Sequence, residues 1–176
     1  MKIEHSGKAA ILFGLGAMTI YLVMVLGTLK HLTDLAVVLP FDLRPTGYSP
    51  ADAAVLLNAL GETGRQFYLT RQIPLDTLYP ALLALTLIST LRWRAVRFGP
   101  TLMTRIGGPL AILAAAFDYL ENLGISLMLL VGADPTLVQA ASAASMLKSA
   151  LTTAAMLAVV AALASILRGR MSRQRA

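Results

Sequence analysis

The stretch Ala9–Leu29, AAILFGLGAMTIYLVMVLGTL, decides the class of fold because its 21 residues include no charged side chain. A helix needs about 20 mainly apolar residues to cross the hydrocarbon core of a bilayer. A cleavable secretory signal has a shorter apolar region, about 7–15 residues, followed by a small-residue cleavage site. Lys30, His31 and Leu32 follow this stretch instead, so we predict a retained membrane helix.

The composition of the whole chain agrees with this interpretation. Of the 176 residues, 57% are hydrophobic and 14% are charged, whereas soluble domains carry about 25% charged residues. These values exclude a disordered chain, a coiled coil and an ordinary soluble domain. Cysteine is absent from the sequence, which excludes disulfides, thiolate metal sites and thiol nucleophiles.

Three further apolar segments have the length of membrane helices, at about 74–91, 106–133 and 137–167. The last 19 residues of the final segment, Ser149–Leu167, are uncharged. Two long uncharged runs disfavour the alternative of a soluble helical bundle. We therefore predict an all-α polytopic membrane protein, a single membrane domain over residues 1–176 with four transmembrane helices.

Basic residues are unevenly distributed between the two predicted sides of the membrane. The two termini and the link between spans two and three hold ten Lys and Arg residues against one acid, Glu4, and the other side holds four against five. Short basic loops stay in the cytoplasm, so we predict cytoplasmic N- and C-termini and a bacterial inner-membrane location. The net charge of +6 is then a topology signal with some attraction to anionic lipid, and no nucleic-acid module accompanies it.

Residues from about 30 to 73 are predicted to form a short helical extracytoplasmic cap between spans one and two. Turn-forming residues fill 40–48, Ser49 and Pro50 are typical of a helix start, and Gly61 is typical of its end. A second short helix is expected over Arg65–Arg71. The cap is either a packed loop or a lid over a site. Its candidate site residues are Asp42, Arg44, Tyr48, Arg65 and Arg71.

Span three carries polar residues in its middle. Asp118, Glu121 and Asn122 are spaced i, i+3 and i+4 and therefore share one helical face. An acidic residue at the bilayer centre costs about 2.5–3.5 kcal/mol even on the lenient insertion scale, so this face should point into the bundle. Asp118 and Lys148 each lie fifteen residues from Ala133, the centre of the turn between spans three and four. The two side chains should lie at one depth and form a buried ion pair.

Asp76 and Glu121 likewise lie at equal distances in sequence from the centre of the basic link 92–105. Asp76 should therefore lie at the depth of Glu121, with Tyr79 one turn further in. Pro80 should loosen this helix and free a carbonyl group. We therefore predict one polar cluster and, as a binding site, the following set: Asp76, Tyr79, Asp118, Glu121, Asn122 and Lys148.

Three carboxylates and one lysine leave this cluster with a formal charge of −2. A cap arginine, a metal ion or a ligand amine would supply the missing positive charge. Lys148 argues against a metal, and His5 and His31 at the span ends have no partner histidine at ligand spacing; we predict no metal site. The alternative is structural, because interhelical hydrogen bonds of about 0.6–2 kcal/mol each hold membrane helices together.

Several short motifs together resemble those of a group of small four-span membrane proteins of unassigned function. The likeness covers about residues 40–150. The motifs are Phe41-Asp42, Gly47-Tyr48-Ser49-Pro50, Leu60-Gly61-Glu62-x-Gly64-Arg65-x-x-Tyr68, Leu75-Asp76-x-x-Tyr79-Pro80 and Phe117-Asp118-x-x-Glu121-Asn122. The resemblance implies that cap and cluster residues recur together, and it carries no activity, catalytic residue or cofactor.

Three classes of function are compatible with these features. The favoured prediction is a non-enzymatic membrane protein that lies in the lipid bilayer and binds a lipid, a small ligand or a membrane-protein partner. The alternatives are an enzyme acting on a lipid or isoprenoid head group, with Asp118 or Glu121 as general base, and a small proton-coupled transporter with the carboxylates as relay. No nucleophile motif supports the enzyme.

Overall fold

The computed structural model describes residues 3–174, with side chains from residue 6 to residue 166. About 90% of the chain is helical, and the described residues form no strand. Within the described residues, four helices are long and apolar enough to cross a membrane: Ser6–Ala36, Pro50–Phe98, Leu102–Val131 and Pro135–Ile166. These findings confirm the predicted all-α, four-span fold class.

The first long helix consists of three consecutive pieces. α1 (Ile3–Val23) passes through a π-helical turn, η1 (Met24–Thr28), into α2 (Leu29–Ala36). It ends where Val37 adopts a left-handed conformation with φ of 57°. The predicted cap boundary at residue 30 therefore differs from the structure, because buried Leu29, Leu32 and Ala36 keep the helix packed beyond the charged residue Lys30.

The second long helix begins at the predicted position. Ser49 and Asp52 form a reciprocal capping box ahead of α3 (Pro50–Phe67). Gly61, with φ of 58° and ψ of −168°, kinks α3 but does not end it. The expected separate helix at 65–71 is instead continuous with η3 (Tyr68–Gln72), a second π-helical turn, and α4 (Ile73–Phe98). Pro74 cannot donate to the carbonyl of Thr70, which fits the irregular turn here.

The third and fourth long helices form the predicted hairpin. α5 (Leu102–Val131) starts at a capping box between Thr101 and Thr104, and α6 covers Pro135–Gln174. Asp134 begins α6 by accepting from the backbone N–H groups of Thr136 and Leu137 at 3.0 Å. Gly124 of α5 faces Ala141 of α6 so closely that it leaves no room for a side chain.

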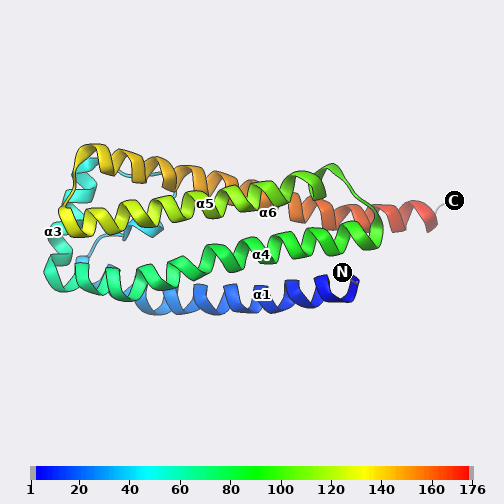
Figure 1. Ribbon diagram of the computed structural model, residues 1–176, viewed down its shortest axis with the longest axis horizontal. Helices are drawn as coiled ribbons and strands as arrows, with labels where there is room; N and C mark the ends of the chain where they lie inside the picture. Colours follow the sequence, from blue (N-terminus) through cyan, green and yellow to red (C-terminus); the bar gives the residue numbers. More distant parts are fainter. Residues whose placement is uncertain (1–2, 175–176) are drawn as a thin grey trace.

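The helices are arranged in two packed pairs. α1 packs chiefly against α4, α6 packs chiefly against α5, and α4 contacts α5 between the pairs (Figure 1). The segment 37–49, which contains the short 3₁₀ helix η2 (Phe41–Leu43), turns back among the helices at the α3 end. There Phe41 and Tyr48 join a buried apolar cluster with residues of α2, α3, α5 and α6. A second apolar cluster lies deeper, around Leu87 and Ala111.

Candidate functional site

Lys148 of α6 is the positive centre of a polar cluster inside the bundle. Its Nζ lies 3.1 Å from Oδ1 of Asp118, and it also forms an ion pair with Glu121. Both acidic residues lie on α5, three positions apart, as the helical spacing predicts. Ser145, one turn before the lysine, donates its hydroxyl to the other carboxylate oxygen of Glu121. The predicted Asp118–Lys148 pair is therefore present, with Asp118 buried and Lys148 partly buried.

Asp76 and Asn122 are joined through the backbone. Pro80 has no N–H group, so the carbonyl of Asp76, four residues earlier, loses its helical donor. The Nδ2 group of Asn122 donates to this carbonyl at 3.0 Å, which ties α5 to the proline-containing turn of α4. Asn122 therefore has a structural role in α4–α5 packing, and the carboxyl group of Asp76 remains free to face the interior.

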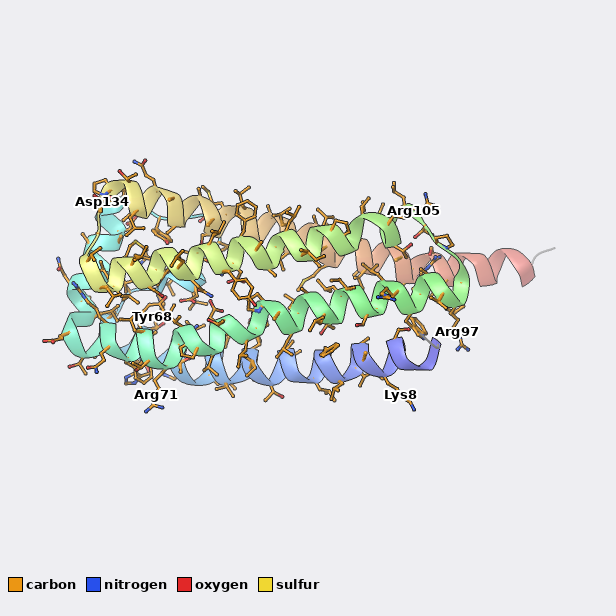
Figure 2. The ribbon with its side chains drawn as sticks, viewed as in Figure 1. Lys8, Tyr68, Arg71, Arg97, Arg105 and Asp134 are labelled. Atoms are coloured by element: carbon orange, nitrogen blue, oxygen red, sulfur yellow. The ribbon has the colours of Figure 1, made fainter. Side chains whose placement is uncertain are left out.

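Asp42 enters the cluster from segment 37–49, although the sequence alone placed it in the cap. Tyr68 donates its hydroxyl to Asp42, and Gln72 Nε2 donates to its other oxygen at 3.3 Å. The carboxyl groups of Asp42 and Asp76 lie within hydrogen-bonding reach of each other. Thr28 in turn donates to Gln72. Figure 2 shows Tyr68 directed between the helices.

The two donors that hold Asp42 come from one π-helical turn, and the other π-helical turn supports them. Tyr68 and Gln72 are the first and last residues of η3, and Thr28 is the last residue of η1. A π-turn widens the helix by one residue and rotates the side chains that follow, and such turns are frequent at functional sites. Here Tyr68 and Gln72 donate to the Asp42 carboxylate, and Thr28 donates to the amide oxygen of Gln72.

Tyr48 is the second cap candidate that reaches the interior. Its backbone N–H donates to Oγ of Ser142 at 2.8 Å, and its ring packs against Phe41 with centroids 4.7 Å apart. Its hydroxyl is buried and has no hydrogen-bond partner among the described residues. Burial, and then the nearby carboxylates of Glu121 and Asp42, raise the pKa of Tyr48 above its ordinary value.

None of the three cap arginines joins the cluster. Arg44 donates to the backbone carbonyl of Leu39 at 2.9 and 2.7 Å, and Arg65 donates to the carbonyl of Leu57 at 3.1 Å. Arg71 is exposed and points away from the bundle (Figure 2). Arg44 therefore stabilises the turn, Arg65 stabilises the α3 kink, and Arg71 lies outside. None of the three compensates the negative charge of the cluster.

A cavity of about 330 Å³ lies beside the cluster. Its polar end is lined by Asp42, Asp76, Asp118 and Lys148. Its deeper wall is apolar and comes from α4 and α5, with lining residues Leu83, Ala84, Leu87, Ala111, Ala114 and Ala115. Tyr79, the remaining predicted residue, lies at the wall, where its ring faces that of Tyr21 at 5.8 Å.

The electrostatic composition of the site is unbalanced. Asp42, Asp76, Asp118 and Glu121 surround one lysine, so four carboxylates and one ammonium give a formal charge of −3. No group of three or more His, Asp and Glu side chains among the described residues has a geometry that would hold a metal ion. The arrangement can pair with a positively charged hydrogen-bond donor or carry a proton.

Sequence reasoning missed several residues that hold the cluster. The sequence patterns do not assign Thr28, Tyr68, Gln72 or Ser145 to the site, although Tyr68 belongs to a quoted motif, and they place Asp42 in the cap. Ser145 had a detectable signal, because it precedes Lys148 by one helical turn and shares its face. The others depend on the path of segment 37–49 and on the π-turns, for which the sequence pattern has no marker.

In comparisons with known proteins, no family model, curated protein or solved structure matches this chain. The resemblance to small four-span membrane proteins stays a prediction.

Proposed function

We propose that the protein is a membrane-embedded, non-enzymatic binding protein for a small amphipathic molecule. The cavity of about 330 Å³ carries this proposal, because one continuous space is ionic at one end and apolar at the other. Ligand sites in proteins are commonly apolar cavities of about 300–1,000 Å³ with a few polar groups that fix orientation. The polar group of the ligand would bind at Asp42 and Asp76, and its apolar part would lie along α4 and α5.

The dimensions of the cavity support a small molecule. Asp76 at one end and Leu87 at the other are eleven residues apart on α4, which corresponds to roughly 16 Å of helix. At about 30 Å³ per water-sized group, the volume accommodates about eleven such groups. This is the size of a short-chain amphiphile and is too small for a complete two-chain lipid.

The mouth of the cavity supports entry from the membrane. Four of its lining residues are exposed: Tyr21 of α1, Leu43 and Pro45 of segment 37–49, and Thr153 of α6. Because α1 packs on α4 and α6 packs on α5, these exposed residues border the space between the two helix pairs. In a bilayer this space faces the hydrocarbon, where amphipathic molecules accumulate.

We further propose that the protein lies in a bacterial inner membrane with both termini in the cytoplasm. Lys8, Arg97 and Arg105 lie toward one end of the bundle, whereas Asp134 lies at the other (Figure 2). Short basic loops stay cytoplasmic, so the cluster and segment 37–49 would lie in the outer half of the membrane.

Native mass spectrometry of the protein extracted with its lipids tests the binding function. Ala114 is buried and lines the cavity, whereas Ala116, two residues later on α5, is exposed. We expect a small-molecule adduct on the wild-type protein that is lost from Ala114→Leu and retained by the matched control Ala116→Leu. Equal adduct on both variants, no adduct on the wild type, or a co-purifying protein in its place would overturn the proposal.

A further inference from the structure

The charges of the cluster divide into a satisfied half and an unsatisfied half. Lys148 pairs with Asp118 and Glu121, and the hydroxyl of Ser145 donates a hydrogen bond to the Glu121 carboxylate. Asp42 and Asp76 face each other at the cavity, and no cap arginine reaches them. Two carboxylates this close require a proton or a cation between them, because like charges at such a distance repel strongly.

A buried polar atom without a partner lies at this cavity. Within the described residues, Oδ2 of Asp76 makes no hydrogen bond, and Asp76 lines the cavity and is more than nine-tenths buried. A carboxylate oxygen is an acceptor, and a buried acceptor without a donor is unfavourable because its lost hydration is not replaced. Oδ1 of Asn122 and the hydroxyl of Tyr48 are also buried and unpaired among the described residues, but neither residue lines the cavity.

A metal ion would satisfy the charge but not the rest of the site. The described residues contain no group of three metal-binding side chains, and Lys148 at the cavity wall would repel a divalent ion. A bare ion would also leave the apolar wall at Leu83, Leu87 and Ala111 without an occupant. A molecule that both neutralises the carboxylates and fills the cavity would therefore combine positive charge, N–H donors and an apolar group.

We infer that the ligand is a primary or secondary ammonium with a small apolar substituent, the nitrogen bound between Asp42 and Asp76 and the substituent along Leu87 and Ala111. This inference rests on the proposed function and specifies its ligand class. An ammonium group supplies two or three N–H donors and one positive charge, which suits the two facing carboxylates and the unpaired Oδ2 of Asp76. Tyr68 and Gln72 act as positioning residues, because their hydrogen bonds hold the Asp42 carboxylate toward Asp76.

Three probes with six carbon atoms each separate charge from size: hexylamine, hexan-1-ol and hexanoate. The measurement is the concentration of each probe that raises the thermal unfolding temperature of the detergent-solubilised protein by a fixed amount. Hydrogen bonds to charged groups contribute about 1.5–3 kcal/mol, so hexylamine should act at a concentration at least about tenfold lower than the other two probes.

Variants assign the effect to the carboxylates. Asp76→Asn should abolish the preference for hexylamine, whereas Asp34→Asn, an exposed aspartate on α2 paired with Lys30, should keep it. Asp42→Asn, in a partly exposed turn, should also reduce the preference and serves as the second variant if Asp76→Asn does not fold.

The outcomes distinguish the two proposals. If hexan-1-ol or hexanoate acts at the same concentration as hexylamine, the ammonium inference is overturned and the binding function stands. If Asp76→Asn and Asp42→Asn both keep the preference, the assigned carboxylates are wrong. If no probe stabilises the wild-type protein, the binding function itself is overturned.

Discussion

Replacing Lys148 with Met tests whether the cluster lies in a dry interior. Methionine keeps most of the length of the side chain but removes the ammonium group. The side chain of Lys148 is 14% exposed and pairs with Asp118 and Glu121. The substitution therefore leaves both carboxylates buried without a positive partner. It also leaves Asp42 and Asp76 without the nearest positive charge.

The expected loss of stability follows from the burial of the pair. Removing one partner of a buried ion pair costs about 3–5 kcal/mol, because the other charge is left uncompensated. Glu121→Gln in the same chain removes one of the orphaned charges while keeping its volume. The double variant Lys148→Met with Glu121→Gln should therefore be more stable than Lys148→Met alone, by about 0.5–3 kcal/mol, the usual range of coupling between residues in contact.

The chain contains a matched control in Lys30. Lys30 forms an ion pair with Asp34 on the surface of α2, and its side chain is 62% exposed. Exposed i, i+4 pairs contribute about 0.3–0.5 kcal/mol, so Lys30→Met should have a small effect. Unfolding of each purified variant is measured by titrating sodium dodecyl sulfate into mild-detergent micelles and following the loss of helical circular dichroism.

The comparison between the two lysines can refute the reasoning. If Lys148→Met loses no more than about 0.5 kcal/mol beyond Lys30→Met, the buried pair contributes no more than an exposed one. The carboxylates would then be well solvated, and the argument that they require a positive partner would fail. A double variant less stable than Lys148→Met would also contradict it, because removing an orphaned charge should relieve the interior.

Two further predictions concern packing away from the cluster. Arg94 is buried and donates through three different nitrogens to two backbone carbonyls and a serine hydroxyl. Arg94→Lys keeps the charge but offers a single nitrogen, so it should lower the free energy of unfolding by about 1.5–3 kcal/mol in the same titration. Arg97→Lys on the exposed face should leave the free energy of unfolding within about 0.5 kcal/mol of wild type. A Cβ on Gly124 would lie 2.6 Å from that of Ala141, so Gly124→Ala should lower stability by about 1–3 kcal/mol through overpacking of α5 against α6. The same change at Gly108, where nothing lies within 4 Å, should raise stability by about 0.5–1 kcal/mol because alanine favours the helix; equal effects at the two glycines would contradict the close crossing.

The sequence predicts the parts of the site that depend on helical periodicity. Counting from the turn at Ala133 places Asp118 and Lys148 at one depth, and their charged atoms lie 3.1 Å apart. Counting across the basic link likewise places Asp76 at the depth of Glu121, and in the structure Asp76 accepts a hydrogen bond from Asn122, the next residue of α5, through a carbonyl that Pro80 frees. These predictions succeed because antiparallel helices joined by a short connection keep equal rises from their common turn.

The same reasoning fails for Asp42. Its position depends on a thirteen-residue segment, 37–49, whose path is set by a left-handed turn at Val37, by the burial of Phe41 and by the bond from Tyr48 to Ser142. None of these has a periodic signature. The sequence pattern does not predict the π-turns either, although η3 contains Tyr68 and Gln72, which donate to the carboxylate of Asp42.

The division of the cluster into two halves decides between a structural and a functional interpretation. The ion pairs of Lys148 with its two carboxylates, and the hydrogen bond from Asn122 to the freed carbonyl of Asp76, need only helix adhesion to explain them. The facing carboxyl groups of Asp42 and Asp76 are different, because they place like charges together beside a cavity. An Asn at either position would remove that repulsion. Arrangements that cost stability are expected where binding or catalysis requires them. Asp42 and Asp76, rather than the conspicuous lysine, are therefore the residues at which a ligand should be sought first.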